Sequence, residues 1–599
     1  SKTGVEKFAW RASKQGIQIE PHRAGLKPWE RKEIETKLKS RKLDGLICTP
    51  TLELGIDIGS IEVVFSILVP WSQFKQRMGR AGRRDNPGYG FLILNDDPVS
   101  EWFKKYPEDY KNEHIVHINP KNKRVSNFMI PFRVLTTDKI KNNLIKKDEK
   151  IFQENMSVFK QKELFTETNE SVEGKKGDIE KHLTKYNIRG MGEDVKVYQK
   201  PLEGITQKFD IKNEIGSETT PLAYQKFHVG AIYIHKKKVF KIIETHLLPN
   251  DEDVDRYVIA KSDSRILYYT RPTLDKIPKI PNDSDIFETI VGGINIKLTD
   301  LEIGKTVRAY TRLSLYDDSP FNEPVIFPDC KKCNEGNHTI ELPDVIPCNG
   351  EEFTFHTRGI VLEIPIPENA IFQARNEPDG PVNPDKQINE IKQEFLDGLH
   401  VIEHVLQHSG VTIANISHDN LDGIYENEPS PGKFKKIYIF DDSGDGESGA
   451  VEAIFYNMEE VILRAFEMLS LCEGPTKKLP LDYLKLKSLK YVQHVYEWWH
   501  NNPETKTLFN CEAVNGCSKC TFLILKCSKF NENLHKPTAV KILEKIVNSI
   551  FEDKLETFKH KKWNDLKESD EFLKDLDNKF GKLIPNASER ISELKNYHF

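Results

Sequence analysis

The 599-residue sequence predicts a chain of mixed α/β and α+β class with several domains. Three observations support this. Strands alternate with charged helical segments up to residue 98, short β-type runs between Asp, Pro and Gly follow, and clustered cysteines with one well-patterned helix come last. At roughly 150 residues per domain the length allows about four domains. The predicted divisions are a parallel α/β domain at 1–98, a helical connector at 99–200, a small β-rich domain at 201–320, an α+β domain at 321–546 and a helical tail at 547–599.

Composition excludes several classes of protein. Hydrophobic residues make up 38% and charged residues 30% of the chain, with a mean hydropathy of -0.55, so the chain can bury real cores and is not fibrous. The most apolar stretch, residues 61–70, falls short of the roughly 20 residues that cross a bilayer, so no membrane partner is expected. The net charge of -5 neither demands nor excludes nucleic acid. Nine cysteines without a secretory leader favour a reducing, cytoplasmic location.

The elements of each domain follow from local patterns. A helix is expected up to Lys14, and Cys48 is expected in the core of a strand. The connector is rich in Lys, Asn and Glu, which indicates small helical modules compatible with a winged helix. Alternation of strands and helices in the first domain is typical of a parallel sheet covered by helices. Apolar strands are expected at residues 46–48, 63–65, 91–94, 231–234 and 265–269.

Three segments of the first domain resemble superfamily 2 helicases. Residues 48–59, CTPTLELGIDIG, resemble motif V, and residues 76–83, QRMGRAGR, resemble motif VI at the expected spacing. Residues 21–26, PHRAGL, resemble the segment that follows motif IV. The resemblance implies that residues 1–98 form the second RecA-like domain of a helicase, which binds ATP with Mg²⁺ together with a first RecA-like domain.

Motif VI has the residue types that ATP hydrolysis requires. Negative charge builds up on the γ-phosphoryl oxygens during hydrolysis, and a guanidinium group compensates it through two parallel hydrogen bonds. The resemblance implies that Arg80 and Arg83 are arginine fingers, and Gly79 allows the backbone to approach closely. A solvated, Arg- and Gly-rich surface loop is the alternative interpretation.

The same resemblance implies the remaining contacts of this domain. Asp57 would contact the ribose, and Gly55, Gln76 and Gly79 would lie near the nucleotide. Thr49 would contact a nucleic-acid phosphate. The predicted nucleic-acid-binding residues are Thr49, Arg23, Lys123 and Arg124.

The phosphate-binding loop of a complete motor is missing. The segment Gly304-Lys305-Thr306 ends like such a loop, but Thr299 stands at the position of its first glycine. The acidic run 251–254 lies in a polar turn on the wrong side of motifs V and VI. We therefore expect the chain to be the C-terminal part of a larger helicase or one half of a split one. It should hydrolyse no ATP without the missing N-terminal half, which lies in the same or another chain.

Four cysteines in one short loop predict a structural zinc site. The spacing is C-x5-C-x2-C-x6-C, and Gly516 lets the chain turn before the C-x2-C pair. Four thiolates close a tetrahedron around Zn²⁺ and leave no open position for catalysis, and such binding contributes about 10–16 kcal/mol to folding. Scattered buried thiols are the alternative. The predicted ligands are Cys511, Cys517, Cys520 and Cys527.

Other cysteines leave alternatives open. Cys472 ends the preceding helix and competes with Cys511 as a zinc ligand. A further group of cysteines supplies only three sulfur ligands, so His338 or His356 would have to be the fourth ligand. The alternative is that this group binds no metal. This second candidate metal site comprises Cys330, Cys333 and Cys348.

A second resemblance extends beyond the motor domain. Residues 516–520, GCSKC, with 533–536, NLHK, are similar to the zinc-binding C-terminal domain of MrfA-type helicases, as are 230–235, GAIYIH, and 268–271, YYTR. Members of that family are DNA-dependent helicases or translocases of repair that move 3′ to 5′, and related zinc domains occur in DISARM and Druantia anti-phage systems. The resemblance implies DNA as partner, single-stranded or a tailed duplex, with ATP, Mg²⁺ and Zn²⁺ as cofactors.

A glycine-rich turn near residue 445 invites a different interpretation. Residues 444–449, GDGESG, follow an apolar strand and precede a helix, as in a dinucleotide-binding fingerprint. The surrounding carboxylates would repel a pyrophosphate, so we interpret the turn as the start of a core helix, with a metal or active-site role as the alternative. These carboxylates belong to Asp441, Asp442, Asp445 and Glu447.

Two functions of different classes are compatible with the sequence. The first is an ATP-dependent DNA helicase or translocase that acts in DNA repair or anti-phage defence. The second is a non-catalytic DNA-binding or scaffolding subunit of a multi-protein defence complex. Arg80, Arg83 and Asp57 favour the motor, because a scaffold would not need them. The basic run 236–238 is a candidate for DNA contact.

Overall fold

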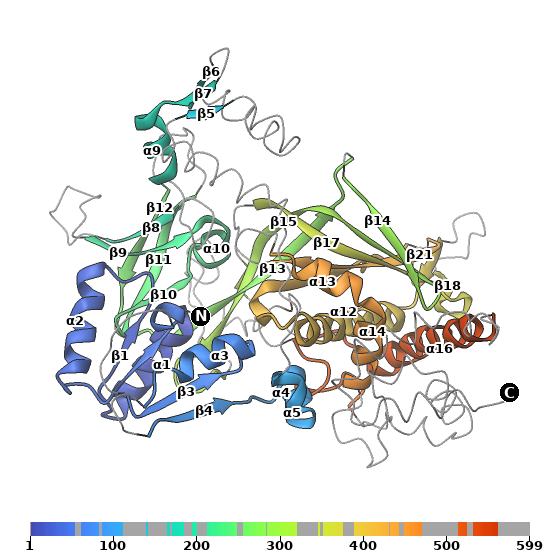
Figure 1. The fold of residues 1–599 in the computed structure, drawn as a ribbon, viewed down its shortest axis with the longest axis horizontal. Helices are drawn as coiled ribbons and strands as arrows, with labels where there is room; N and C mark the ends of the chain where they lie inside the picture. Colours follow the sequence, from blue (N-terminus) through green and yellow to red (C-terminus); the bar gives the residue numbers. More distant parts are fainter. Residues whose placement is uncertain are drawn as a thin grey trace, which may run out of the picture.

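The chain folds into two lobes that lie side by side (Figure 1). In one lobe the N-terminal helices and strands lie next to a five-stranded sheet, and in the other a seven-stranded sheet covers a group of helices. The structure is a computed structural model. It describes residues 2–53, 61–82, 87–111, 139–141, 164–167, 171–184, 194–200, 213–247, 256–282, 284–319, 346–347, 352–374, 388–430, 432–442, 448–469, 513–523, 527 and 531–560.

The N-terminal part alternates helices with parallel strands, as the sequence predicts. Strand β1 pairs in parallel with β2, and β3 pairs in parallel with β4. A parallel bridge between Ile61 and Ala81 continues the second pair. The elements are α1 (Lys2–Lys14), β1 (Ile19–His22), α2 (Pro28–Lys39), β2 (Gly45–Cys48), η1 (Pro50–Leu52), β3 (Val63–Ile67), α3 (Trp71–Met78) and β4 (Tyr89–Ile93).

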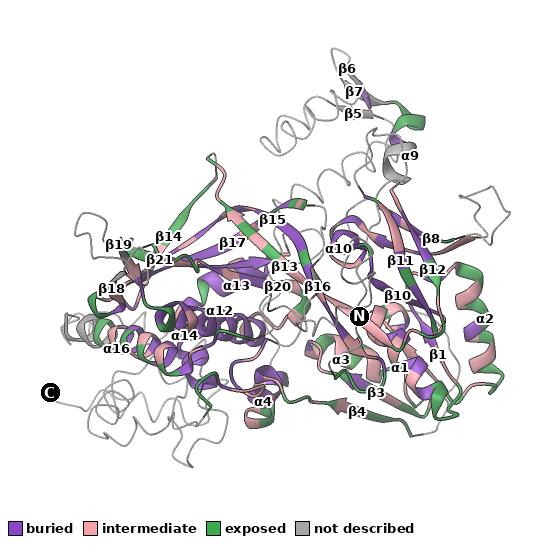
Figure 2. Cartoon of the chain, turned by 180° about the vertical axis from the view of Figure 1, so that it is seen from behind, coloured by how far each residue is buried: buried purple, intermediate pink, exposed green. Residues whose placement is uncertain are grey.

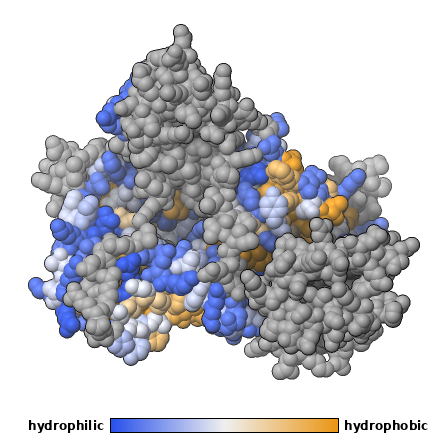
Figure 3. All heavy atoms as spheres, in the orientation of Figure 1, coloured by the Kyte–Doolittle hydropathy of each residue, from blue (hydrophilic) through white to orange (hydrophobic). Residues whose placement is uncertain are grey.

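One face of the β3 and β4 pair is apolar and exposed. The side chains on this face lie opposite one another in register, and they are between 41% and 67% exposed. The rings of Phe65 and Phe91 stack at a centroid distance of 5.1 Å. Figure 3 shows the resulting orange patch over these strands. Parallel strands are normally covered on both faces. The exposed residues are Val63, Phe65, Ile67, Tyr89, Phe91 and Ile93.

Cys48 is not part of the core. It is the last residue of β2 and is exposed, which corrects the expectation of a buried thiol. The other three residues of β2 are only half-buried, and Cys48 lies where the strand opens into the following loop.

The described residues of the predicted connector form strands as well as helices. The connector begins with α4 (Pro98–Lys105) and α5 (Pro107–Lys111). The side chain of Asp97 caps the N-terminus of α4, because it accepts a hydrogen bond from the Ser100 amide over 2.9 Å. A three-stranded antiparallel sheet and one helix follow among the described residues. Their bounds are β5 (Lys139–Lys141), β6 (Phe165–Glu167), β7 (Ser171–Gly174) and α9 (Lys176–Thr184).

The five-stranded sheet crosses the predicted boundary at residue 200. Its order is β10-β11-β12-β8-β9, so β8 is an inner strand although it precedes that boundary. Strand pairing, which joins distant segments, decides where the domain begins. The elements are β8 (Asp194–Gln199), β9 (Glu214–Thr219), α10 (Thr220–Lys226), β10 (Ile232–His235), β11 (Lys238–His246) and β12 (Tyr257–Ser262).

The seven-stranded sheet also crosses a predicted boundary. Its main path is β13-β15-β17-β21-β20, and β14 and β16 pair with β15. Strands β13 and β15 were expected in the β-rich domain but belong to this C-terminal sheet. The strands are β13 (Tyr268–Lys279), β14 (Phe287–Val291), β15 (Ile294–Ser314), β16 (Ile346–Pro347), β17 (Glu352–Pro365), β20 (Leu421–Tyr425) and β21 (Phe434–Asp441), beside a separate pair, β18 (Ile371–Ala374) and β19 (Ile388–Ile391).

Helix α12 (Gln393–Ala414) is the centre of the largest core. It is buried on nearly every side (Figure 2), and its buried residues include polar ones such as His400, Glu403 and His404. Gly398 allows close approach to the last helix, because a Cβ there would lie 2.8 Å from a methyl carbon of Thr538. The other elements of this lobe are η3 (Glu368–Ala370), η5 (His418–Asn420), α13 (Ala450–Tyr456), α14 (Met458–Met468) and α16 (Lys536–His560).

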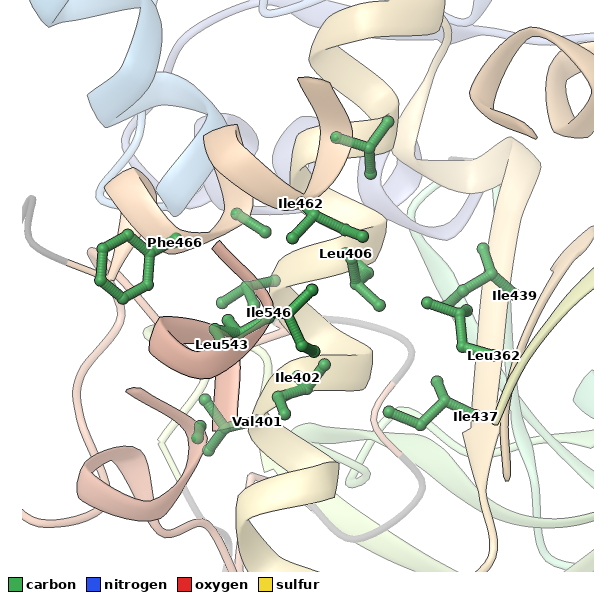
Figure 4. Close-up of a cluster of buried hydrophobic side chains, with 14 of the residues drawn as sticks. Leu362, Val401, Ile402, Leu406, Ile437, Ile439, Ile462, Phe466, Leu543 and Ile546 are labelled. Carbon is green, nitrogen blue, oxygen red and sulfur yellow. The ribbon is translucent and has the colours of Figure 1, made fainter. Parts of the chain in front are cut away.

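Side chains from three helices and the sheet meet at α12 (Figure 4). Helix α16 runs across the predicted start of the tail at residue 547, and α4 contributes the fully buried Trp102 to the same core. Core packing therefore unites segments that the sequence divides. None of the described helices combines the length and the apolar character that a membrane crossing requires. The core residues labelled in Figure 4 are Leu362, Val401, Ile402, Leu406, Ile437, Ile439, Ile462, Phe466, Leu543 and Ile546.

Two buried histidines make stability depend on pH. His228 and His235 are 4% and 8% exposed. Burial lowers the pKa of His228 to about 4, and burial with the charge of Arg23 lowers the pKa of His235 to about 3. The ordinary pKa is about 6.5, so each imidazole takes up a proton more readily in the unfolded chain. Their contribution to stability is complete above pH 6.5 and is lost as the pH falls toward 4 and 3.

We expect the free energy of unfolding to fall below about pH 6.5, by up to about 1.4 kcal/mol per pH unit for each of these histidines. Urea unfolding at about pH 7, 6 and 5 measures this dependence. His228→Gln should flatten the pH dependence. Equal pH dependence in the His228→Gln variant and the wild type would contradict the expectation.

Candidate functional site

Two arginines of motif VI form hydrogen bonds to Glu53 of motif V. From the end of α3, Arg77 donates to the Glu53 carboxylate over 2.5 Å and to the Ser66 hydroxyl over 2.9 Å. Arg80 donates from Nη2 to the Glu53 carbonyl oxygen, also at 2.5 Å. Because both guanidinium groups converge on one residue of motif V, the two motifs form a single structural unit.

Three of the predicted nucleotide-site residues lie together. Gln76 and Gly79 are exposed at the C-terminal end of α3, and the half-buried Arg80 follows directly. Gly82 has a φ of 72°, which lies in the left-handed region that favours glycine, so the turn requires this residue type. The roles of three further residues stay predictions because these lie outside the described residues, namely Gly55, Asp57 and Arg83.

Thr49 stands just beyond the carboxyl end of strand β2. Its amide donates to the carbonyl oxygen of His22 over 3.1 Å, which ties the segment to β1. Ligands of open parallel sheets bind outside the carboxyl ends of the strands, so this position is compatible with the predicted phosphate contact. Lys123 and Arg124 lie outside the described residues.

The predicted nucleic-acid contact of Arg23 is not supported by its position. Arg23 is 1% exposed and donates from Nε to Glu6 Oε1 over 2.7 Å. Its Nη2 lies 2.9 Å from Nδ1 of His235 and 3.3 Å from the hydroxyl of Tyr233. Glu6 has an exposed fraction of 0%. Arg23 is thus half of a buried ion pair at the contact between the N-terminal part and the five-stranded sheet, where a DNA phosphate has no access.

The basic run 236–238 is used at the same contact. It forms the tight turn between β10 and β11, with φ values of 48° at Lys236 and 63° at Lys237. Lys236 Nζ lies 2.6 Å from a carboxylate oxygen of Glu30, and Lys237 Nζ lies 2.8 Å from one of Glu20. These cations pair with carboxylates of the N-terminal part, which speaks against a DNA-binding surface here.

The C-x2-C pair has the geometry of two zinc ligands. The Sγ atoms of Cys517 and Cys520 lie 3.9 Å apart. With Zn–S bonds of about 2.3 Å, two sulfurs of a tetrahedral site lie about 3.8 Å apart. Gly516 has a φ of 75°, as the expected turn requires. The buried Lys536 donates from Nζ to Cys520 Sγ over 3.4 Å, which favours the thiolate form that metals bind.

Cys527 lies beside two histidines that sequence reasoning missed. Its Sγ is 3.4 Å from Nε2 of His400. The ligand atoms of Cys527, His400 and His404 all lie within 4.8 Å of one another, and all three residues are buried. The four-residue spacing of these histidines could have been recognised in the sequence, because residues i and i+4 lie on the same face of a helix. The four-cysteine ligand set and the second candidate site stay predictions, because these residues lie outside the described part: Cys511, Cys472, Cys330, Cys333 and Cys348.

The two described carboxylates at the end of β21, Asp441 and Asp442, have partners within the chain, whereas Asp445 and Glu447 lie outside the described residues. Lys305 Nζ lies 3.0 Å from Asp422 and 2.7 Å from Asp442, and Ser448 donates to the Asp441 carboxylate. Lys305 stands inside β15, so the sequence around it is no phosphate-binding loop. Strand β21 is antiparallel to both neighbours, whereas a dinucleotide fold needs parallel strands. These contacts favour a structural role for Asp441 and Asp442.

Comparison with known proteins identifies the class to which this geometry belongs. Residues 1–85 match the family described as the helicase conserved C-terminal domain. Residues 1–85 therefore match a helicase C-terminal domain, which agrees with the expectation from motifs V and VI.

Two curated relatives are ATP-dependent helicases. The helicase hrq1 of Schizosaccharomyces pombe is 41% identical over 92 residues, which are 15% of this chain and 9% of hrq1. The uncharacterized ATP-dependent helicase YprA of Bacillus subtilis is 35% identical over 108 residues, which are 17% of this chain and 14% of YprA. The matched regions thus span only 9% and 14% of these relatives. The crystal structure of the DUF1998 helicase MrfA bound to DNA covers 91% of this chain and 60% of that chain, at 17% identity and a TM-score of 0.48.

Proposed function

We propose that the chain supplies the second RecA-like domain of an ATP-dependent DNA helicase or translocase that moves 3′ to 5′. The observation that carries this proposal is the convergence of motifs V and VI on Glu53, with Arg80 next to the exposed Gln76 and Gly79. Arg80 and Arg83 would compensate the charge on a γ-phosphoryl group that a first RecA-like domain holds with Mg²⁺. When that domain closes, Arg80 would exchange the Glu53 carbonyl for a phosphate oxygen.

The apolar face of β3 and β4 supports the need for a further domain. Six large apolar side chains share this exposed face in register. Contiguous exposed apolar patches mark interaction sites. A further part of the helicase that covers these strands would complete the two-sided burial that parallel strands normally have.

DNA is the proposed nucleic-acid partner, as a single strand or a tailed duplex. Thr49, Lys123 and Arg124 are the proposed contacts, and the relation to MrfA-type sequences favours action in DNA repair or anti-phage defence in the cytoplasm. Zn²⁺ at Cys517 and Cys520 would hold the C-terminal loop in shape and take no part in the reaction.

A non-catalytic scaffold is the second candidate. The ion pairs between the N-terminal part and the five-stranded sheet are what a rigid docking subunit would need, and they join Lys2 to Glu218, Glu30 to Lys236 and Glu20 to Lys237. The exposed C-terminal end of α3 favours the motor instead, because a non-catalytic scaffold would not need Arg80 beside the exposed Gly79.

ATP hydrolysis by two forms of the protein distinguishes these functions. The chain alone should show no DNA-stimulated hydrolysis, because it has no phosphate-binding loop. Joined with the N-terminal helicase half, it should hydrolyse ATP faster in the presence of single-stranded DNA, and less so at high salt. Hydrolysis by the chain alone would contradict the proposal. A combined protein that forms stably but is no faster than the N-terminal half would support the scaffold.

A further inference from the structure

We infer that His400, His404 and Cys527 bind a divalent metal ion of the zinc type, at a site separate from the Cys517 and Cys520 pair. This inference assigns Cys527 to a mixed nitrogen and sulfur site in place of the four-cysteine set. It does not depend on the proposed helicase function.

A row of histidines on α12 faces the cysteine-bearing loop. His400 Nδ1 lies 3.0 Å from the carbonyl oxygen of Asn533, and His404 Nδ1 lies 2.8 Å from that of Thr521. With these donors used, the Nε2 atom of each ring carries a lone pair. Metal-binding histidines almost always donate their other ring N–H to a carbonyl or carboxylate, so both rings are arranged as ligands.

The distances agree with a tetrahedral site. With Zn–S of about 2.3 Å and Zn–N of about 2.0–2.1 Å, a sulfur and a nitrogen ligand lie about 3.6 Å apart. The distance from Cys527 Sγ to His400 Nε2 is 3.4 Å. The backbone amide of Asn531 also donates to Cys527 Sγ over 3.1 Å, and such a hydrogen bond stabilises a thiolate.

The second independent observation is an unsatisfied buried atom. Nε2 of His404 has no hydrogen-bond partner among the described residues, and the residue is 0% exposed. Oε2 of the Glu403 carboxylate lies 3.5 Å away. A buried lone pair that faces a carboxylate is unfavourable. A cation between them removes this cost, because it accepts the lone pair and is attracted by the carboxylate.

Charge and ligand type select the class of metal. One thiolate and the nearby Glu403 carboxylate balance two positive charges, and both imidazoles remain neutral. Imidazole with thiolate is a donor set that suits Zn²⁺ and not Mg²⁺ or Ca²⁺, which prefer oxygen. Gly423 helps to keep Glu403 in place, because a Cβ there would lie 2.2 Å from Glu403 Oε1. Such a metal would fasten the loop to α12, the centre of the core.

His408 offers a matched control on the same helix. It is 1% exposed like its neighbours, but it uses Nε2 toward the Phe522 carbonyl oxygen at 3.2 Å. It therefore contacts the loop without belonging to the group of metal ligands. A His408→Gln variant separates the loss of packing from the loss of a ligand.

Metal content of the full chain, measured by elemental analysis after gel filtration, tests the inference. The double variant His400→Gln/His404→Gln should lose one ion per chain relative to the wild type, and His408→Gln should lose none. Cys517→Ser/Cys520→Ser should retain the ion at the histidine site. Unchanged metal content in the double variant, or complete loss in the Cys517→Ser/Cys520→Ser variant, would overturn the inference.

X-ray absorption of the zinc-loaded wild type gives a test that needs no variant. Imidazole rings produce a characteristic outer-shell scattering that thiolates do not. Nitrogen and sulfur neighbours with imidazole scattering are expected. A spectrum with sulfur neighbours alone, or a chain that binds no zinc, would overturn the inference and leave the helicase proposal untouched.

Discussion

Replacing Arg80 by alanine is expected to slow DNA-stimulated ATP hydrolysis of the complete helicase by about a thousandfold or more, in the range typical of arginine fingers. Arg80 already stands at the exposed end of α3, with its guanidinium held by the Glu53 carbonyl. Charge on the γ-phosphoryl oxygens increases only in the transition state. The loss should therefore appear in kcat, with little change in the KM for ATP.

Steady-state hydrolysis rates at saturating DNA measure this effect. Arg80→Lys keeps the charge but loses the planar fork, so it should recover little of the rate. Lys75→Ala is the control, because Lys75 is an exposed cation on the same helix, 5.9 Å from the ring centre of Trp71. It should hydrolyse ATP like the wild type. An Arg80→Ala enzyme that keeps most of its kcat would show that Arg80 is no arginine finger.

Replacing Arg23 by alanine is expected to destabilise the N-terminal part by about 3–5 kcal/mol. The carboxylate of Glu6 is fully buried and accepts from Arg23 Nε over 2.7 Å. Without Arg23 it would keep, among the described residues, the amide of Lys237 at 3.1 Å, which leaves a buried charge largely uncompensated. Hydrogen exchange of amides in α1 and β1, followed by mass spectrometry, measures the loss locally.

The ion pair of Lys37 with Glu33 is the control for this measurement. The two side chains lie one turn apart on α2 at 2.7 Å and are 43% and 59% exposed. Lys37→Ala should change stability by less than about 0.5 kcal/mol, because water screens exposed pairs. The double variant Glu6→Leu/Arg23→Met should recover part of the loss, because neither charge remains buried. Equal exchange in Arg23→Ala and Lys37→Ala would contradict the structural role of Arg23.

The class of protein was predictable because its signals are local. Motifs V and VI lie within residues 48–83, and the residue types at Arg80, Gln76 and Gly79 follow from what ATP hydrolysis needs. The parallel strands and their helices also follow from local alternation, since apolar periodicity depends on neighbours in the chain. The turn at Gly516 was predictable for the same reason.

Domain boundaries were not predictable to the same degree. β8 joins a sheet that lies mostly beyond residue 200, and β13 and β15 join the sheet of the C-terminal lobe. Each strand shows the same local pattern whichever partner it has. Hydrogen bonding between strands that are far apart in sequence decides the division, and a single sequence does not show such pairing.

The helicase C-terminal domain and the cysteine knuckle were visible in the amino-acid sequence, because both depend on residues close together along the chain. The surroundings of Arg23 and Cys527 depend on how distant segments pack. The tertiary structure places Arg23 against Glu6 and His235, and it brings Cys527 to His400 on a distant helix. Burial and partners determine whether a charged or metal-binding side chain serves stability or function, and both arise only when distant segments pack together.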